Sequence, residues 1–198
     1  MKRLAVLISN AGSGTNLQAI IDVIKNKTLS AKIVVVISSD LDAFGLERAR
    51  KNNIPTEICN KKNLLTVLKK YNPDYICLAG WKQIILDEVI DAFPKRILNL
   101  HPGLIPNAIG GFVRNPDKTN ALWNRGKLTD VAIKNFLDNN ASYAGSSIHC
   151  LSYRFDFGKV LGRTFEKIKR SDDVESLYKR LKKKENKLYV EVLGKLCN

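Results

Sequence analysis

Asn99 and His101 are the two residues of this sequence whose types and spacing best suit chemistry. They lie at the end of an apolar run, residues 96–100, that predicts a short strand, and Pro102 and Gly103 end this strand with a turn. Because successive side chains of a strand alternate between its faces, the amide and the imidazole leave the same face. They can act together on a ligand beyond the strand's carboxyl end, or they can merely bond backbone groups of the turn.

A glycine-rich stretch, residues 12–16, is the second group of interest. Its two glycines permit a tight turn, and the free N–H groups that open the following helix suit a phosphate. Ser13, Thr15 and Asn16 can add side-chain donors. The stretch lacks the Lys-Ser/Thr ending of a P-loop, and Leu17 stands where a dinucleotide fingerprint has its third glycine. A monophosphate cradle is therefore favoured, with an ordinary glycine-rich turn as the alternative.

Glu185 is the third candidate because it interrupts an apolar helical stripe. A long amphipathic helix is predicted after Ser171, a suitable N-cap, and its inward stripe consists of Val174, Leu177, Tyr178, Leu181, Glu185, Leu188, Val192 and Leu196. A carboxylate on a buried stripe is costly unless it has a partner. Glu185 either lies at the tolerant edge of the helix or receives a substrate amine or hydroxyl.

The elements that must position these residues alternate between strands and helices. Strands are predicted at residues 4–8, 33–37, 56–59, 75–79 and 96–100, and helices at 17–24, 43–51 and 64–71. The alternation predicts an α/β fold with a doubly wound, mostly parallel sheet. Ligands of such sheets bind beyond the carboxyl ends of the strands, which places Asn99 and His101 at a candidate site.

The second half of the chain predicts a different set of elements. These are a loop after Pro102, a helix at residues 115–124 opened by Asn115 and Pro116, a helix at 130–137, and an antiparallel ribbon of strands at 146–151 and 160–168. Asp156 and Gly158 belong to the turn of that ribbon.

Composition indicates one globular domain in a reducing compartment. A chain of 198 residues, 44% of them apolar, fits a single domain, residues 1–198, with a sizeable core. The cysteines show neither a C-x-x-C motif nor metal spacing, which favours free thiols in a cytoplasmic protein. The apolar run after Met1 is too short for a signal peptide, and no stretch is long enough to span a membrane.

The net charge of +14 suits anionic ligands of several kinds. Nucleic acid is not expected as a partner, because the sequence has no nucleic-acid motif and its lysines are spread along the chain. The densest cluster, residues 182–184, falls in the predicted last helix and is interpreted as its solvated side.

Several stretches together resemble the phosphoribosylglycinamide formyltransferases, a branch of the folate-dependent formyltransferases. The matching stretches are residues 6–9, 12–20, 42–49, 78–80, 97–102 and 145–149, with Asp156 and Gly158. The Asn-x-His-Pro and Asp-x-Gly pieces are shared by the wider group, whereas the glycine-rich opening and residues 42–49 (Asp-Ala-Phe-Gly-Leu-Glu-Arg-Ala) are more specific to this branch. The resemblance implies a Rossmann-like formyltransferase fold with an antiparallel ribbon and a long C-terminal helix.

The resemblance implies that Asn99, His101 and Asp156 form a catalytic trio. The implied reaction is attack of the glycinamide amine on the formyl carbon of 10-formyltetrahydrofolate. Asn99 and a protonated His101 would stabilise the developing oxyanion, an effect worth about 3–4 kcal/mol per well-placed donor. Asp156 would favour the charged imidazole and help to relay protons through water.

The remaining implied sites bind the two small molecules. Gly14, Thr15 and Asn16 match the loop for the ribonucleotide phosphate, His149 matches a position near that substrate, and Glu185 matches a carboxylate that holds the glycinamide end. The implied folate contacts are Lys82, Gln83, Ile84, Ile85 and Asn99. No metal is required, and a monomer or a homodimer is expected.

The chain departs from the family pattern at three places. Residues 81–85 read Trp-Lys-Gln-Ile-Ile where the family usually has Phe-Met-Arg-Ile-Leu, so the arginine is missing. Residues 103–106 read Gly-Leu-Ile-Pro in place of Ser-Leu-Leu-Pro. His149 follows His101 by 48 positions, a longer gap than usual, which indicates an insertion around residues 107–140 with an additional helix.

Two rival interpretations remain open at this point. Another formyl-folate enzyme, such as a 10-formyltetrahydrofolate hydrolase or a methionyl-tRNA formyltransferase, would share the trio but would normally carry a further domain. An inactive formyltransferase-like module that only binds ligands would have no need to retain all three residue types of the trio.

Overall fold

The computed structural model describes residues 1–9 and 12–198, so Asn10 and Ala11 of the glycine-rich opening lie outside the described residues. The chain forms two compact units. The first consists of Met1–Asn99 with Tyr189–Asn198, and the second of Leu100–Leu188. Strand β5 (Ile97–His101) and helix α6 (Val174–Cys197) each continue from one unit into the other.

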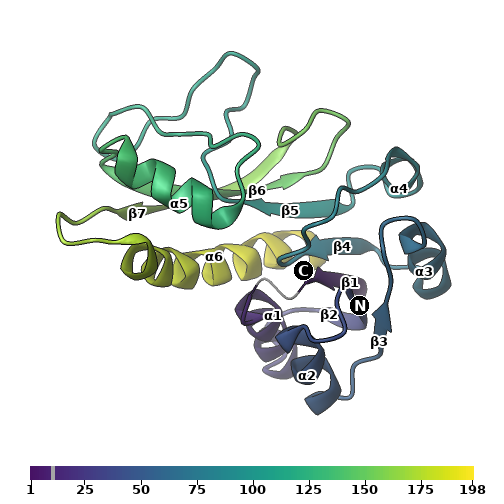
Figure 1. The fold of residues 1–198 in the computed structure, drawn as a ribbon. Coiled ribbons are helices and arrows are strands. Elements are labelled where there is room, and N and C mark those ends of the chain that lie inside the picture. The colour runs from purple at the N-terminus through teal and green to yellow at the C-terminus, as the bar shows by residue number, and fades with distance from the viewer. Residues whose placement is uncertain (10–11) are drawn as a thin grey trace. The chain divides into compact units, whose positions relative to one another are not determined.

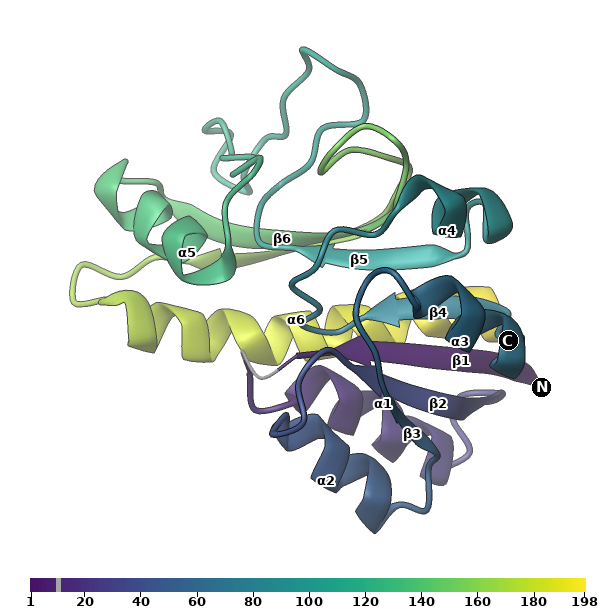
Figure 2. The same cartoon turned by 45° about the vertical axis from the view of Figure 1, so that its right-hand side comes forward.

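The first unit is a parallel sheet built from alternating strands and helices. Before β5 its elements are β1 (Lys2–Ile8), α1 (Thr15–Lys25), β2 (Ala31–Ser38), α2 (Phe44–Lys51), β3 (Thr56–Ile58), α3 (Leu64–Tyr71), β4 (Tyr75–Leu78) and α4 (Asp87–Ala92). The strands pair in the order β3-β2-β1-β4-β5, all in parallel. Helices α1 and α2 contact each other and β2 (Figures 1 and 2).

The core of the first unit follows from its continuous apolar strands. Residues 4–7 of β1 are completely buried, as expected for a strand covered on both faces. Tyr189, near the end of α6, is also completely buried, and its hydroxyl lies 3.2 Å from the Leu78 carbonyl oxygen and 3.1 Å from that of Leu98. This part of α6 is therefore tied to β4 and β5 of the same unit.

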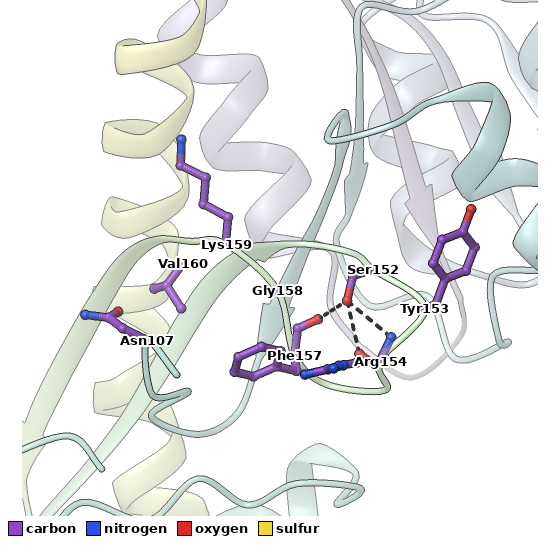
Figure 3. Close-up of a pocket in the computed structure, with 8 residues that line it drawn as sticks. All are labelled: Asn107, Ser152, Tyr153, Arg154, Phe157, Gly158, Lys159 and Val160. Carbon is purple, nitrogen blue, oxygen red and sulfur yellow. Dashed lines mark hydrogen bonds between the residues drawn. The ribbon is translucent and has the colours of Figure 1, made fainter. Parts of the chain in front are cut away.

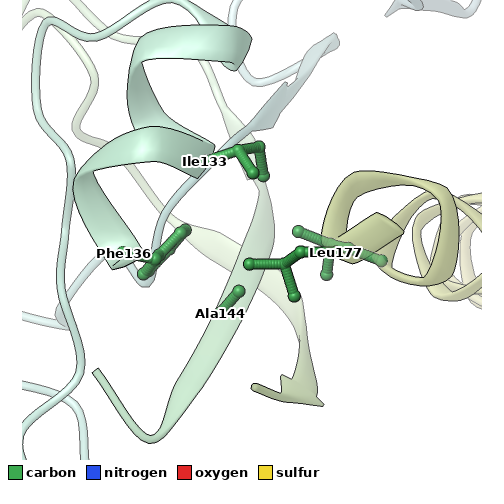
Figure 4. Packing of buried hydrophobic residues seen from close by; sticks show 5 residues of the cluster. Ile133, Phe136, Ala144 and Leu177 are labelled. Carbon is green, nitrogen blue, oxygen red and sulfur yellow. The ribbon is translucent and has the colours of Figure 1, made fainter. Parts of the chain in front are cut away.

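The second unit contains an antiparallel pair of strands. Strand β6 (Tyr143–Cys150) pairs with β7 (Val160–Lys167), and the register shifts between Ile148 and His149. Helix α5 (Thr129–Asp138) and the first part of α6 bury apolar side chains against β6. Figure 4 shows this cluster, formed by Ile133, Phe136, Ala144, Leu177 and Leu181.

The described strands and helices confirm the predicted fold class. They comprise five parallel strands, one antiparallel pair and a long C-terminal helix. Among the described helices, none combines the length and the apolar composition that a membrane crossing requires. The short helix α4 was not predicted because its six residues are too few to show a helical period.

The helix predicted at residues 115–124 is wrong. The segment is irregular, with an isolated antiparallel bridge between Arg114 and Asn120. The Asp117 carboxylate accepts hydrogen bonds from the backbone N–H of Thr119 at 3.1 Å and from its hydroxyl at 2.6 Å. Such local bonds from side chains compete with helix formation, so the Asn-Pro pair opens a turn.

Two predictions for α6 are also corrected. The helix begins at Val174, and a reciprocal pair caps it instead of Ser171: the Asp173 carboxylate accepts the Ser176 N–H at 2.8 Å, and the Ser176 hydroxyl accepts the Asp173 N–H at 3.1 Å. The lysine cluster is not simply a solvated side. Lys182 pairs with Glu185 at 3.1 Å and Lys184 with Glu166 at 2.8 Å.

Candidate active site

His101 is the last residue of β5, and its imidazole is almost completely buried. Its Nε2 lies 2.7 Å from the backbone carbonyl oxygen of Trp123. Because a carbonyl can only accept a hydrogen bond, Nε2 must carry a proton. The other ring nitrogen, Nδ1, lies 3.5 Å from Oδ1 of Asp156. The imidazole is thus held between a neutral acceptor and a carboxylate.

Asp156 lies in the turn between β6 and β7, with a left-handed backbone at φ 49°. Its Oδ2 accepts the Gly126 N–H at 2.8 Å. Burial raises the pKa of the Asp156 carboxyl, but the hydrogen bond and charge of His101 and the Gly126 N–H outweigh burial and leave that pKa below its ordinary value. The carboxylate is therefore ionised at neutral pH, and it can stabilise a positive charge on the imidazole.

His149, in β6, is the second histidine of this centre. The two imidazoles meet edge to face with their centroids 6.4 Å apart. Burial, helped by the positive charge of His101 and opposed by Asp156, lowers the pKa of His149 from 6.5 to about 4. Its Nδ1 lies 3.1 Å from the Cys150 carbonyl oxygen, so a neutral ring carries its proton on Nδ1.

Asn99 precedes His101 by two positions in β5, opposite Leu78 in the register with β4. The strand's alternation therefore directs both side chains to one face, as predicted. The Asn99 side chain is half-buried. Asn99 is the last residue of the first unit's main segment, whereas His101, His149 and Asp156 belong to the second unit, which brings these three together.

The glycine-rich turn supplies buried polar groups at the start of α1. Gly14 is left-handed at φ 67°, and a side chain there would approach the Gly45 backbone to 3.1 Å. Among the described residues, no side chain caps the helix. The Thr15 hydroxyl and the Asn16 side-chain oxygen are buried without a hydrogen-bond partner among the described residues. The turn therefore offers helix N–H groups and the Thr15 hydroxyl as donors for a phosphate, whereas the Asn16 oxygen can only accept a hydrogen bond.

Arg48 braces this turn, and the sequence reasoning missed it. Its Nε–H donates to the Ser13 carbonyl at 2.9 Å, and its Nη1–H donates to Gln18 Oε1 at 2.8 Å. Both contacts lie within the first unit. Arg48 is part of the motif at residues 42–49, but a lone arginine on an amphipathic helix normally indicates only a solvated face.

Glu185 is buried, as its place on the apolar stripe predicted, and it has the partners that burial requires. Its Oε1 accepts the Ser146 hydroxyl at 2.6 Å, and its Oε2 lies 3.1 Å from Lys182 Nζ. Burial lowers the pKa of Lys182, but the charge of Glu185 and the hydrogen bonds of Glu185 and Tyr178 outweigh burial and raise it overall. The carboxylate thus has an internal ion pair as well as a hydroxyl donor.

The segment with the predicted folate contacts is an irregular loop after β4. Ile84 is 63% exposed, whereas Ile85 is part of the core. The Gln83 side-chain oxygen accepts the Lys61 N–H at 2.6 Å, which ties this loop to the loop after β3. The Trp81 indole N–H is buried with no acceptor among the described residues. Lys82 is exposed.

A pocket of about 660 Å³ lies beside the connection between β6 and β7, lined by Asn107 and by residues 152–154 and 157–160 (Figure 3). It contains none of the predicted site residues. Its wall braces the Asp156 turn, because the Ser152 hydroxyl donates to the Phe157 carbonyl at 2.7 Å. Among the described residues, no three His, Cys, Asp or Glu side chains are grouped so as to hold a metal ion.

Comparison with known proteins gives one consistent result. The model of the formyl transferase family matches residues 2–193. A chloroplastic phosphoribosylglycinamide formyltransferase of Arabidopsis thaliana is 34% identical over 207 residues, which cover 99% of this chain. The chain spans 65% of the length of that relative.

Solved structures show the same likeness in three dimensions. Glycinamide ribonucleotide transformylase 1 from Symbiobacterium toebii matches with a TM-score of 0.81 at 31% identity, over 98% of this chain and 86% of the other. Phosphoribosylglycinamide formyltransferase from Bacillus halodurans matches with a TM-score of 0.82 at 27% identity, over 98% of this chain and 95% of the other.

Proposed function

The chain belongs to the formyl transferase family, and on that premise we propose that it transfers the formyl group of 10-formyltetrahydrofolate to the amine of 5'-phosphoribosylglycinamide, a step of purine biosynthesis. The observation that carries the proposal is the buried pair of His101 and an ionised Asp156. Relatives named for this activity, among them the Arabidopsis thaliana protein at 34% identity, support the choice of substrates.

The proposed reaction begins with attack of the substrate amine on the formyl carbon. The carbonyl oxygen becomes an oxyanion, which the Asn99 amide stabilises by donating a hydrogen bond and the protonated His101 stabilises by its positive charge. The amine loses a proton, N10 of the folate gains one, and the bond between N10 and the formyl carbon breaks. Asp156 stabilises the imidazolium through this sequence and takes part in proton transfer through water.

The proposed binding residues divide between the two small molecules. Gly14, Thr15 and Asn16 bind the ribonucleotide phosphate through helix N–H groups and through the Thr15 hydroxyl, which has no hydrogen-bond partner among the described residues. His149 and Glu185 serve the remainder of that substrate. The folate contacts are Lys82, Gln83, Ile84, Ile85 and Asn99, to which the buried indole N–H of Trp81 adds a donor.

The proposal also covers the domain organisation, the compartment, the oligomeric state and the partners of the enzyme. We take residues 1–198 as a single formyltransferase domain, with residues 107–140 as an insertion, acting in the cytoplasm as a monomer or homodimer. Its partners are the two small molecules, and no metal takes part.

A two-arm assay tests the proposed function. Purified protein is incubated with 10-formyltetrahydrofolate, with and without 5'-phosphoribosylglycinamide, and release of deformylated folate is followed. We expect release only in the presence of the ribonucleotide. Release that ignores the ribonucleotide would instead identify a hydrolase, and no release in either arm would identify a binding module.

A further inference from the structure

Residues 119–126, called the strap below, contact the proposed catalytic centre from the insertion. The Trp123 carbonyl accepts the His101 Nε2–H at 2.7 Å. Three residues later the Gly126 N–H donates to Asp156 Oδ2 at 2.8 Å. The strap therefore bonds both members of the His–Asp pair through its backbone.

Asn124 fastens the strap. Its side chain is buried, and its amide nitrogen donates to the Pro102 carbonyl at 3.0 Å and to the Ala132 carbonyl at 3.2 Å. Its amide oxygen accepts from Asn135 Nδ2 at 2.8 Å. One side chain thus links the strap to the turn after His101 and to α5. The left-handed backbone of Asn124, φ 57°, is one that asparagine tolerates better than most residues.

Gly103 makes the contact sterically possible. A Cβ at this position would overlap the Trp123 carbonyl oxygen, so only glycine leaves room for that oxygen beside the imidazole. The Leu104 N–H donates to the Leu122 carbonyl at 2.9 Å and joins the turn to the strap a second time. The close approach of the strap therefore depends on glycine at position 103.

The Trp123 carbonyl decides which ring nitrogen of His101 holds the proton. A neutral imidazole has one N–H, and the carbonyl and the Asp156 carboxylate compete for it from opposite sides. The 2.7 Å contact at Nε2 is much closer than the 3.5 Å contact at Nδ1. The neutral ring therefore holds its proton on Nε2. Nδ1, which faces Asp156, is the nitrogen that gains and loses a proton.

We propose that Asn124 is a positioning residue, which holds the Trp123 carbonyl against His101 and so fixes the tautomer and the plane of the imidazole. Its catalytic consequence rests on the proposed formyl transfer, whereas its effect on the ring does not. Without the Asn124 side chain, the Trp123 carbonyl moves away from the ring and Asp156 becomes the stronger hydrogen-bond acceptor. The proton of the neutral ring then moves from Nε2 to Nδ1.

The test uses the ring nitrogens of His101, which can be followed by ¹⁵N NMR because the chain has only 2 histidines. Asn124→Gly removes the amide and tolerates the left-handed backbone. Asn140→Gly is the matched control, because Asn140 is exposed and also left-handed at φ 50°. At a pH where the ring is neutral, we expect the Nε2–H signature in the parent and the control, and the Nδ1–H signature in Asn124→Gly.

Gly103→Ala provides a second route to the same result. It displaces the carbonyl from the other side and leaves Asn124 intact, so it tests the proposal even if Asn124→Gly fails to fold. An Nε2–H signature that survives in a folded Asn124→Gly or Gly103→Ala protein would overturn the proposal. So would an Nδ1–H signature in the parent.

Steady-state kinetics of the same variants provide a separate test. In Asn124→Gly we expect kcat to fall by about tenfold to a hundredfold, the scale of a small misplacement of a catalytic group, with both KM values nearly unchanged. Asn140→Gly should leave kcat and both KM values unchanged. A parent protein without formyl transfer would sink the proposed function, while the NMR result would still decide whether Asn124 positions the ring.

Discussion

The glycine-rich turn and the His101 centre differ in how their polar groups are satisfied. In the turn, the described residues leave the Thr15 hydroxyl and the Asn16 side-chain oxygen buried without partners. At the His101 centre, the protein itself supplies an acceptor for Nε2 and a donor for the Asp156 carboxylate. Among the described residues, the first region thus keeps polar atoms without partners, whereas the second has its partners within the protein.

The contrast fits the different roles that we propose for the two regions. A binding loop gains affinity when the ligand satisfies groups that the fold leaves unpaired. A catalytic group must instead be held in one protonation state and one orientation before the reaction, so that no reorganisation is needed at that moment. Substitutions in the turn should therefore affect KM, and substitutions at the centre should affect kcat or stability.

The largest effect is expected from Asp156→Asn. The amide keeps an acceptor for the Gly126 N–H but loses the charge that stabilises a protonated His101. We expect kcat to fall about 10²- to 10³-fold, in the range of general acid–base contributions, with KM for the ribonucleotide within about twofold. Steady-state kinetics measure both constants. A loss confined to KM would contradict the division between the two regions.

The next largest expected effect is the dependence of the free energy of unfolding on pH. The folded pKa of His149 is about 4, below its ordinary 6.5, so the unfolded chain binds a proton first as the pH falls. The free energy of unfolding should therefore decrease from about pH 6.5 toward pH 4, by about 2 kcal/mol between pH 7 and pH 5. Urea unfolding of the parent and of His149→Gln measures this.

The His149→Gln protein should show a clearly smaller decrease over the same interval. Carboxyl groups with lowered pKa values, such as Asp156, lose their contribution only below this window. An equally steep decrease in both proteins would show that the buried imidazole is not the group responsible.

The smallest effect is expected from Thr15→Val, which removes a hydroxyl without a partner among the described residues and keeps the shape. We expect KM for the ribonucleotide to rise about tenfold with kcat unchanged, and the free energy of unfolding to change by less than about 1 kcal/mol.

Ser146→Ala is the contrasting control, because that hydroxyl donates to the buried Glu185 carboxylate. It should cost about 1–3 kcal/mol of stability. A Thr15→Val protein destabilised as much would mean that the hydroxyl has an internal role.

Much of the fold was predictable because its signals are local. Apolar runs and turn residues located β1 to β5, and the helix at residues 64–71 matches the structure at both ends. The incorrect predictions are in segments where local side-chain hydrogen bonds decide the backbone structure. Asp117 and Thr119 form side-chain bonds that replace a helix with a turn. Asp173, not Ser171, caps α6, because its carboxylate accepts the Ser176 N–H at 2.8 Å.

The site was predictable only where residue types carry its chemistry. Asn99 and His101 could be paired by strand alternation, and Glu185 could be assigned to a buried stripe. Whether Asp156 lies beside His101 depends on tertiary structure, and the resemblance alone suggested it. The Trp123 carbonyl was beyond sequence reasoning, because every residue has a backbone carbonyl and no residue type marks the one that reaches an imidazole.

Gly103 limits which substitutions this chain can accept during evolution. Any other residue there collides with the Trp123 carbonyl, although the two positions are twenty residues apart in sequence. A serine at position 103 should be harmful on its own, yet acceptable after a change that retracts the strap. Mutations at the two places are therefore expected to be epistatic. A library that varies position 103 together with residues 119–126 should recover non-glycine residues only in combination with altered straps.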